Sequence, residues 1–356
     1  MKTRKIMLGN VAIGGDAPVS IQTMCNTKTD DIEGSLAQIH RCANMGCDII
    51  RLAVPDESVL PAFKIICEKS PIPVIADIHF DWKLAMGSLK AGADGIRVNP
   101  GNIRQEKDMR RIAREAGRLH RVVRIGVNGG SMDPEIEDKY GRTPEALVLS
   151  ALNYVKIFEE EGCTALKVSI KSSDVRTSID AACLFASKSD IPLHIGVTEA
   201  GPISVGLVKS AIGIGTLLLK GIGATIRVSL STEPEQEVKA AKNILAAIGL
   251  RKNSGPELVS CPTCGRTCIK LFPIVDAIEK ELDDLAGQGK KIGLKKIAIM
   301  GCEVNGPGEA RDADVGIAGG KGRGLLFKCG KPIRTMPENE LVPALIQEIR
   351  SAIIED

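Results

Sequence analysis

Residues Val122–Asn128 read VVRIGVN, a short run of β-branched residues that contains an arginine and is followed by a polar loop. Such a run between two amphipathic helical patterns predicts the buried strand of a βα unit. Seven more runs of this kind occupy residues 20–24, 48–52, 73–78, 94–98, 165–170, 192–197 and 224–230. Eight βα units fit the ~250 residues of a (β/α)8 TIM barrel, which is the fold that we predict. A doubly wound open sheet stays open as an alternative, because periodicity does not reveal strand order.

The segments that flank these units predict the rest of the architecture. Lys5–Gly15 (KIMLGNVAIGG) has the pattern of a β-hairpin that turns at Gly9-Asn10, and we expect it to plug the bottom of the barrel. Residues 249–257 (GLRKNSGPE) have the composition of a linker. A chain of 356 residues also exceeds what one core usually supports. We therefore expect an α/β chain with the barrel in residues 1–250 and a small α+β domain in residues 257–356.

Composition narrows the classes of function. The net charge is only +3 and aromatic residues make up 3% of the chain, so the chain lacks the charge and the stacking side chains of a nucleic-acid binder. The basic residues near Met1 are followed by Leu8-Gly9-Asn10 and not by a long apolar run, so we expect no signal peptide and no membrane partner. Eleven cysteines are scattered along the chain, which indicates a reducing, cytoplasmic location.

Five of the predicted strands carry a cation near their carboxyl ends: Arg51, Arg97, Arg124, Lys171 and Arg227. In a barrel these ends surround one mouth, where the chemistry of the fold takes place. Five cations repel one another there unless an anion lies among them, and the planar fork of arginine suits a diphosphate. Pairing with a nearby carboxylate explains any single arginine equally well. It does not explain all five, because we expect only Asp77 and Glu199 to neutralise them.

Asp77 and Glu199 are also candidates for acid–base chemistry. A carboxyl group beside bound phosphate can have its pKa raised toward a value that is useful for proton transfer. Plain ion pairing with the arginines is the alternative role for both. The other polar residues at these strand ends are His79, Asn99, Asn128, Ser169, Thr198 and Ser229.

A second constellation lies in the C-terminal part of the sequence. Cys261 and Cys264 form a C-x-x-C motif before a predicted helix, and Cys302 follows in a loop rich in Gly and Pro. This spacing is typical of a tetrahedral thiolate site that holds either zinc or an iron–sulfur cluster. A thioredoxin-like redox pair is a third alternative, which the distant third cysteine disfavours. Spacing leaves the fourth ligand open between Cys268 and Glu309.

At these residues the sequence resembles the 4-hydroxy-3-methylbut-2-enyl diphosphate synthase family, also called IspG or GcpE, of the methylerythritol phosphate route to isoprenoids. The most specific stretches are CPTCGR at 261–266 and MGCEVNGPGEA at 300–310. Further support comes from IADIHF (75–80), GIRVNPGN (95–102), RIGVNGGS (124–131) and GVTEAGP (196–202). The resemblance extends over nearly the whole chain, and the short length corresponds to the two-domain bacterial form.

The resemblance implies a [4Fe–4S] cluster held by Cys261, Cys264, Cys302 and the carboxylate of Glu309. Cys268 stands where the family has no ligand, so it offers a competing thiolate. A carboxylate on iron is displaced more easily than a thiolate, which would leave one iron open to the substrate.

The implied reaction is the reductive opening of 2-C-methyl-D-erythritol 2,4-cyclodiphosphate. Two electrons enter, a hydroxyl leaves as water, and linear 4-hydroxy-3-methylbut-2-enyl diphosphate results. Glu199 would supply the proton, Asp77 and His79 would order the pocket, and Arg266 would reach the substrate from the cluster side. The barrel cations would clamp the diphosphate, with neutral contacts from Asn99, Asn128, Thr198 and Ser229.

Electrons would have to come from another protein, because no flavin or nicotinamide fingerprint precedes a suitable helix. The resemblance implies reduced ferredoxin or flavodoxin as the donor, and a homodimer as the assembly. The leading rival is a zinc-bearing module on a pterin- or corrinoid-type methyl-transfer barrel, in which Cys268 completes a zinc site of four cysteines. A binding protein without catalysis is the third hypothesis.

Overall fold

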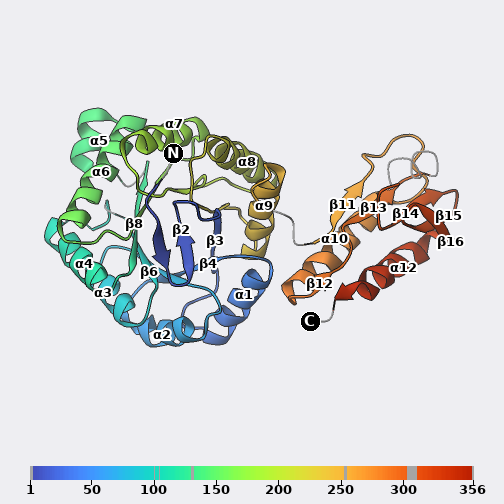
Figure 1. The fold of residues 1–356 in the computed structure, drawn as a ribbon, viewed down its shortest axis with the longest axis horizontal. Helices are drawn as coiled ribbons and strands as arrows, with labels where there is room; N and C mark the ends of the chain where they lie inside the picture. Colours follow the sequence, from blue (N-terminus) through green and yellow to red (C-terminus); the bar gives the residue numbers. More distant parts are fainter. Residues whose placement is uncertain are drawn as a thin grey trace. The chain divides into compact units, whose positions relative to one another are not determined.

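Eight parallel strands form a barrel in the N-terminal part of the described chain (Figure 1). They are β3 (Ser20–Met24), β4 (Ile49–Val54), β5 (Val74–Ile78), β6 (Gly95–Val98), β7 (Val122–Asn128), β8 (Leu166–Lys171), β9 (His194–Ile195) and β10 (Thr225–Ile226). The ladder runs β8-β7-β6-β5-β4-β3-β10-β9, and a parallel bridge between Val168 and Leu193 joins its two ends. The predicted (β/α)8 barrel is therefore confirmed, and the open doubly wound sheet is wrong.

Two strands are shorter than the sequence predicts. The runs 192–197 and 224–230 contain only β9 and β10, of two residues each. A Cβ atom on Gly196 would lie 2.3 Å from the carbonyl oxygen of Arg227. The two backbones stay close here, because the Arg227 amide donates to the Ile195 carbonyl at 3.1 Å, and loops then continue toward the barrel mouth.

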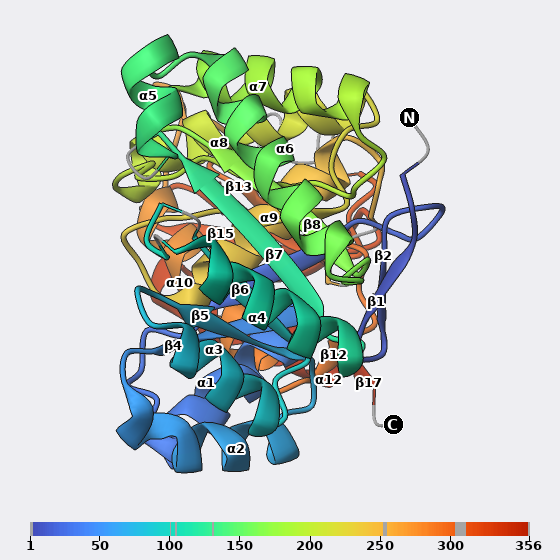
Figure 2. The same cartoon turned by 90° about the vertical axis from the view of Figure 1, so that its left-hand side faces the viewer.

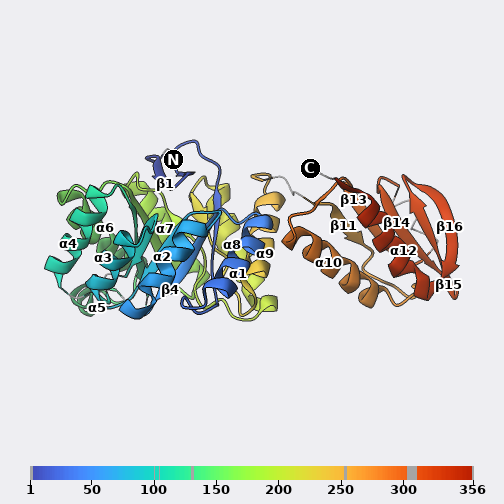
Figure 3. The ribbon, with the colours of Figure 1, turned by 90° about the horizontal axis from the view of Figure 1, so that it is seen from below.

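Helices connect the strands and surround the barrel (Figure 3). Six of them begin at a side chain that accepts a backbone N–H group, as Asp31 does before α1, Thr143 before α6 and Asp174 before α7. The helices are α1 (Ile32–Asn44), the 3-10 helix η1 (Glu57–Val59), α2 (Leu60–Lys69), α3 (Trp82–Lys90), α4 (Glu106–Arg118), α5 (Pro134–Tyr140), α6 (Pro144–Glu160), α7 (Val175–Lys188), α8 (Ile203–Leu219) and α9 (Pro234–Ala247).

A hairpin closes the amino end of the barrel strands (Figure 2). Strands β1 (Ile6–Leu8) and β2 (Val11–Ile13) pair antiparallel, and the chain turns at Gly9, whose φ is +54°. Ile6, Leu8 and Ile13 form one apolar cluster with residues at or near the starts of three barrel strands: Ile49, Ile75 and Val122. The predicted plug at the bottom of the barrel is confirmed.

The computed structural model describes residues 3–99, 101–103, 105–129, 132–251, 255–302 and 311–354. The chain divides into two compact units, Met1–Arg251 and Lys252–Asp356. We describe each unit by itself. Within the described ranges, none of the helices combines the length and the apolar composition of a membrane span.

The second unit is an α+β module built on a mixed sheet in the order β11-β13-β14-β15-β16. Strands β11, β13 and β14 are parallel, and β15 and β16 form an antiparallel extension. A small antiparallel pair, β12 with β17, completes it. The elements are β11 (Glu257–Ser260), α10 (Leu271–Gly287), β12 (Lys291–Ile292), β13 (Lys296–Met300), β14 (Val315–Gly320), β15 (Arg323–Lys328), β16 (Lys331–Pro337), α12 (Glu338–Ser351) and β17 (Ile353–Ile354).

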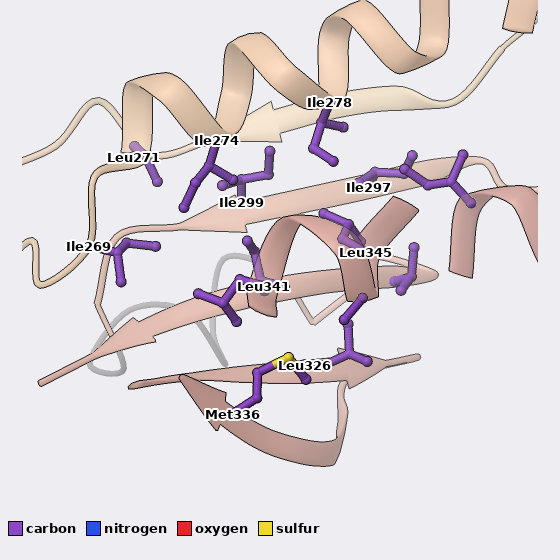
Figure 4. Packing of buried hydrophobic residues seen from close by; sticks show 14 of the residues in the cluster. Ile269, Leu271, Ile274, Ile278, Ile297, Ile299, Leu326, Met336, Leu341 and Leu345 are labelled. Atoms are coloured by element: carbon purple, nitrogen blue, oxygen red, sulfur yellow. The ribbon is translucent and has the colours of Figure 1, made fainter. Parts of the chain in front are cut away.

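Helices α10 and α12 pack on this sheet and bury its core (Figure 4). Ile278 of α10, Leu345 of α12 and Ile297 of β13 are each completely buried in one cluster. A fully buried Ile or Leu side chain stabilises a fold by about 1.5–3 kcal/mol relative to an exposed one. This unit therefore has a hydrophobic core of its own.

Candidate functional site

Cations occupy inward positions on adjacent barrel strands. Successive side chains of a strand alternate between the two faces of the sheet, so every second residue points into the barrel. Asp77 of β5 is in register with Arg97 of β6, which is in register with Arg124 of β7. Arg124 is in turn in register with Lys167 of β8. All four side chains are buried, so their charges must be balanced from within the barrel.

Asp77 is the shared counter-charge of this group. Its carboxylate lies 3.7 Å from Nη1 of Arg51, 3.4 Å from Nη1 of Arg97 and 3.4 Å from Nε2 of His79. Burial by itself raises the pKa of Asp77, but the two arginines and the hydrogen bond from His79 outweigh it and hold the pKa below its ordinary value. The carboxyl group is therefore ionised and anchors two arginines at once.

Arg227 has a counter-charge that the sequence analysis missed. Its Nε lies 3.1 Å from Oε2 of Glu237, a buried residue of α9. Glu237 also accepts hydrogen bonds from the Thr23 hydroxyl at 2.6 Å and the Leu230 amide at 3.0 Å. The expectation that Asp77 and Glu199 alone neutralise the ring was wrong. The first turn of α9, which reads PEQE after the eighth strand, is the signal that could have revealed it.

The remaining cations have too few partners among the described residues. Nε and Nη1 of Arg124, and Nε of Arg97, are buried without a hydrogen bond to any described group. Burial, and then the neighbouring guanidinium groups, lower the pKa of Arg124 well below its ordinary value. The same two causes lower the pKa of Lys171, and burial is the main cause that lowers the pKa of Arg51 to about 10. The barrel mouth is thus arranged to receive an anion.

Several fully or almost fully buried polar residues of the barrel were not predicted, and three of them carry a large amine, imidazole or amide side chain. They are Lys167, His194 and Gln22, with exposed fractions of 0%, 0% and 1%. Nζ of Lys167 lies 3.4 Å from Oε1 of Gln22. Burial, followed by nearby cations, lowers the pKa of both Lys167 and His194 well below their ordinary values. Lys167 was predictable, because alternation in LKVSIK places it on the same face as Lys171.

The neutral candidates divide between the wall and the rim of the mouth. Asn99 is 3% exposed, whereas Asn128, Thr198 and Ser229 are half-buried. His79 is exposed, yet its Nε2 lies 3.2 Å from Nη1 of Arg97. These positions surround the cation group on several strands.

Glu199 lies on the exposed rim and not within the buried group. Its φ is +50°, a left-handed conformation that side-chain-bearing residues rarely adopt. No ion pair joins it to any residue that the structure describes. Phe80, beside His79, has a similar backbone with a φ of +63° and is 74% exposed. Strained backbone of this kind gathers at functional sites.

In the second unit, parallel strands bring two of the cysteines together. Cys261 follows the end of β11, and Cys302 lies just beyond the end of the neighbouring β13. The Gly301 amide donates to Sγ of Cys261 at 3.2 Å, and a Cβ atom on Gly301 would lie 3.3 Å from that sulfur. The sequence could not show this close approach, which depends on the register of β11 and β13.

Cys264 lies in a turn that donates hydrogen bonds to its sulfur. The turn is formed by Thr263, with a φ of +65°, and by a 3.1 Å bond from the Cys264 amide to the Thr267 hydroxyl. Hydrogen bonds from the backbone and the side chain of Arg266 lower the pKa of the exposed Cys264 thiol. N–H donors around cysteine sulfurs favour thiolates, which is the state that binds metal.

The other candidate ligands are placed differently. The Cys268 thiol is exposed and donates a hydrogen bond to the Arg266 carbonyl at 3.2 Å. Glu309 lies outside the described residues. Among the residues that the structure does describe, no three His, Cys, Asp or Glu side chains are gathered as a metal site. The described cysteines fit a thiolate-bound group by the chemistry of their donors.

Family models match both units of the chain. The GcpE TIM-barrel domain matches residues 3–242, and the GcpE protein C-terminal domain matches residues 257–351. Together the matches cover more than half of the chain.

Two curated relatives are similar over almost their full length. A 4-hydroxy-3-methylbut-2-en-1-yl diphosphate synthase (flavodoxin) of Persephonella marina is 52% identical, over 98% of this chain and 97% of the relative. A protein of the same name from Geobacter sulfurreducens is 50% identical, over 99% of both chains. Among solved structures, the HPPK-DHPS protein of Plasmodium falciparum with pterin and p-hydroxybenzoate is 11% identical. The match covers 70% of this chain and 49% of the HPPK-DHPS chain. Its TM-score is 0.51, which shows a shared barrel fold only.

Proposed function

Because this chain belongs to the GcpE family, we propose that it converts 2-C-methyl-D-erythritol 2,4-cyclodiphosphate to 4-hydroxy-3-methylbut-2-enyl diphosphate. The chain is then an oxidoreductase of isoprenoid biosynthesis, as its relatives are. With substrate and product both written as fully protonated acids, the reaction consumes two electrons and two protons. It breaks one C–O bond of the ring and releases one water. The barrel, residues 1–250, binds the diphosphate, and residues 257–356 carry the redox group.

The observation that carries this proposal is the excess of buried positive charge at the barrel mouth. Asp77 and Glu237 are the buried carboxylates that pair with the ring, and Arg124 has donors without a described partner. A diphosphate supplies the missing negative charge and accepts bidentate hydrogen bonds from guanidinium groups. The proposed diphosphate contacts are Arg51, Arg97, Arg124, Lys171 and Arg227, with Asn99, Asn128, Thr198, Ser229 and His79 around them.

Two carboxylates have different proposed roles in proton handling. Asp77 is ionised and holds Arg51 and Arg97 in position, so its main task is to order the clamp. Glu199 stands on the rim, where it can reach the carbon skeleton of a substrate whose diphosphate lies deeper. We assign to Glu199 the proton that accompanies ring opening.

Cys261, Cys264, Cys302 and Glu309 are the proposed ligands of a [4Fe–4S] cluster. When bound, the cluster supplies electrons one at a time and a Lewis-acidic iron for the departing hydroxyl. The thiol hydrogen bond of Cys268 to a carbonyl supports its exclusion from the ligand set. We also propose that Arg266 contacts the substrate, and its hydrogen bonds to Cys264 support this role.

The chain itself holds no second redox domain in this proposal, so a flavodoxin delivers the electrons, as the names of the relatives indicate. A ferredoxin is the alternative donor. We also propose a homodimer, supported by the exposed apolar residues Val205, Val208 and Ile212 on the outer face of α8. All eleven cysteines are free, which supports a reducing compartment, the cytoplasm.

One anaerobic experiment tests the function. Protein purified without oxygen is mixed with the cyclic diphosphate and reduced flavodoxin, and the product is identified by mass spectrometry and phosphorus NMR. We expect a linear allylic diphosphate, visible absorption that bleaches on reduction, and acid-labile sulfide. Zinc without sulfide, or an unchanged cyclic substrate, would reject the proposal in favour of the zinc-bearing rival.

A further inference from the structure

One end of the C-terminal sheet brings the cysteines together with exposed cations. Strands β11, β13 and β14 are parallel, so their carboxyl ends lie at the same end of the sheet. Cys261 follows β11, Cys302 follows β13, and Lys321 follows β14. A Cβ atom on Gly319, near the end of β14, would lie 2.6 Å from the carbonyl oxygen of Gly301. We call this region the cysteine end of the sheet.

Besides Arg266, which contacts Cys264, three more cations are exposed at the cysteine end. Lys270 precedes α10, Lys321 lies in the turn after β14, and Arg323 begins β15. None of the three forms an ion pair with a residue in the described part of the chain. The acids nearby, Glu338 and Glu340, lie in the first turn of α12, and Glu338 accepts the Lys270 amide at 2.7 Å. Helices α10 and α12 both begin at this end, which adds positive partial charge.

An exposed aromatic side chain lies at the same end of the sheet, where α10 begins. Phe272, in the first turn of α10, is 67% exposed and stands two residues from Lys270. Its neighbour Leu271 is 3% exposed and belongs to the core, so the helix is oriented by Leu271 and leaves Phe272 in solvent. Figure 4 shows Leu271 and Ile269 packed at this end of the cluster. Large apolar side chains ringed by charge mark surfaces that bind other proteins.

We propose that the cysteine end is the docking surface for the electron donor, a small electron-transfer protein with an acidic face. The proposal rests on the proposed function, because that function requires a protein donor. Phe272 supplies the central apolar contact, and Lys270, Lys321 and Arg323 attract and orient the donor. Each encounter oxidises the donor by one electron and reduces the cysteine-bound group by one, so two encounters serve one turnover.

This arrangement suits a transient complex. Electron-transfer complexes bury little surface, so long-range attraction sets their rate of formation more than their lifetime. Opposite charges around the contact can raise such rates by about 10- to 1,000-fold at low salt. The proposed surface therefore affects mainly the rate at which the donor associates.

The test compares two reductants in the holoenzyme. Turnover is measured with reduced flavodoxin and with reduced methyl viologen, a small cation that needs no docking surface. We expect Lys321→Glu/Arg323→Glu to lower flavodoxin-driven turnover at low salt by about tenfold or more. We also expect Phe272→Ala to lower it severalfold, while both variants keep the parent rate with methyl viologen.

The control is Lys295→Glu/Lys331→Glu, which makes the same charge change at the opposite end of the sheet, before β13 and at the start of β16. The control should keep the parent rate with both reductants. A flavodoxin rate unchanged by the first double variant, or lowered equally by the control, would reject the docking surface. An equal loss with methyl viologen would also reject it and place the two cations in substrate handling. If the parent converts the cyclic substrate with neither reductant, the proposed function fails instead.

Discussion

At the scale of single residues, the barrel mouth is governed by a shortage of counter-charges. Asp77 serves Arg51 and Arg97, and Glu237 serves Arg227, while buried donors of Arg124 have no described partner. An unpaired buried charge is strongly unfavourable. An anionic ligand would pair with these cations and so lower the free energy of this region. Binding of a diphosphate should therefore depend on individual side chains.

We expect Arg124→Ala to weaken the binding of inorganic pyrophosphate by about tenfold or more, since a hydrogen bond to a charged group contributes about 1.5–3 kcal/mol. Isothermal titration calorimetry measures the affinity. The matched control is Arg121→Ala, which removes an arginine near the amino end of β7 that pairs with Asp94. Equal affinities of the parent and Arg124→Ala would show that the ring does not bind the diphosphate.

We expect diphosphate binding to take up protons through Lys171. Burial and neighbouring cations lower the pKa of Lys171 in the free protein, which favours the neutral amine, and a bound anion raises the pKa again. Because the pKa rises on binding, protons are taken up and affinity falls as pH increases above neutrality. Titrations in two buffers of different ionisation enthalpy count the protons. The Lys171→Met variant should take up fewer protons on binding pyrophosphate. If it takes up as many protons as the parent, a group other than Lys171 is responsible for the uptake.

The cysteines give a second test at this scale. Cys264→Ala should abolish the visible absorption of anaerobically purified protein, because it removes a proposed thiolate ligand. Cys268→Ala should keep the visible absorption, because the Cys268 thiol donates a hydrogen bond to the Arg266 carbonyl and is not a proposed ligand. Absorption spectra with iron and sulfide analysis measure the result. Loss of the cluster in Cys268→Ala would make Cys268 the fourth ligand in place of Glu309.

The sequence predicts the role of a residue where that role follows from a local pattern. Arg97 and Arg124 follow from strand alternation and from the position of a run within a βα unit. Glu237 was not predictable in the same way, because it comes from a helix and reaches Arg227 across ten residues. The PEQE segment indicates acids close to the eighth strand, but which of them reaches Arg227 depends on how α9 packs on the barrel.

At the scale of elements, α8 is unusual among the helices that surround the barrel (Figure 1). Its outer face carries Val205, Val208 and Ile212, which are 49%, 57% and 53% exposed. The spacing places them in one stripe of the helix, and Lys209 is the single charged residue between Ile203 and Leu219. An exposed apolar stripe of this kind is typical of a surface that packs on another protein. A symmetric contact with a second copy covers both stripes at once.

We expect Val208→Glu/Ile212→Glu to convert the proposed homodimer to a monomer, because the change places two carboxylates opposite two others across a twofold axis. Sedimentation velocity measures the mass. Leu149→Glu is the control, since Leu149 of α6 is 39% exposed but belongs to another helix. The control should stay dimeric, and a dimeric double variant would remove α8 from the interface.

Elements differ in how well the sequence predicts them. The bounds of β3 match the predicted run 20–24, because its first two residues pair with β10 and its last three pair with β4. The runs that contain β9 and β10 were predicted too long. There Gly196 lies against the Arg227 backbone, and a local pattern does not reveal this contact between residues about thirty positions apart.

At the scale of the whole molecule, the two units have separate hydrophobic cores. The division falls between Arg251 and Lys252, and apolar clusters are complete within each unit. The fold of both units was predictable, since repeated βα patterns and the linker composition are visible in the sequence. How the barrel and the cysteine module cooperate was not predictable from their residues, because no pattern within either unit encodes the other.

We expect the isolated fragment Met1–Arg251 to bind inorganic pyrophosphate within a few-fold of the affinity of the whole chain and to be colourless. The reason is that all proposed diphosphate contacts of the barrel, and none of the cysteine ligands, lie in this fragment. Calorimetry and an absorption spectrum measure both properties. A folded fragment without pyrophosphate binding would show that the second unit helps to hold the anion.

The hairpin β1–β2 closes the amino end of the barrel, whose interior is filled with side chains. Substrate and product both carry a diphosphate, and with the amino end closed both approach the proposed cation ring from the carboxyl-end rim. We therefore expect the product to compete with the substrate for this site and to act as a competitive inhibitor. The pace of this step in a cell then depends on how quickly the next enzyme consumes the released allylic diphosphate.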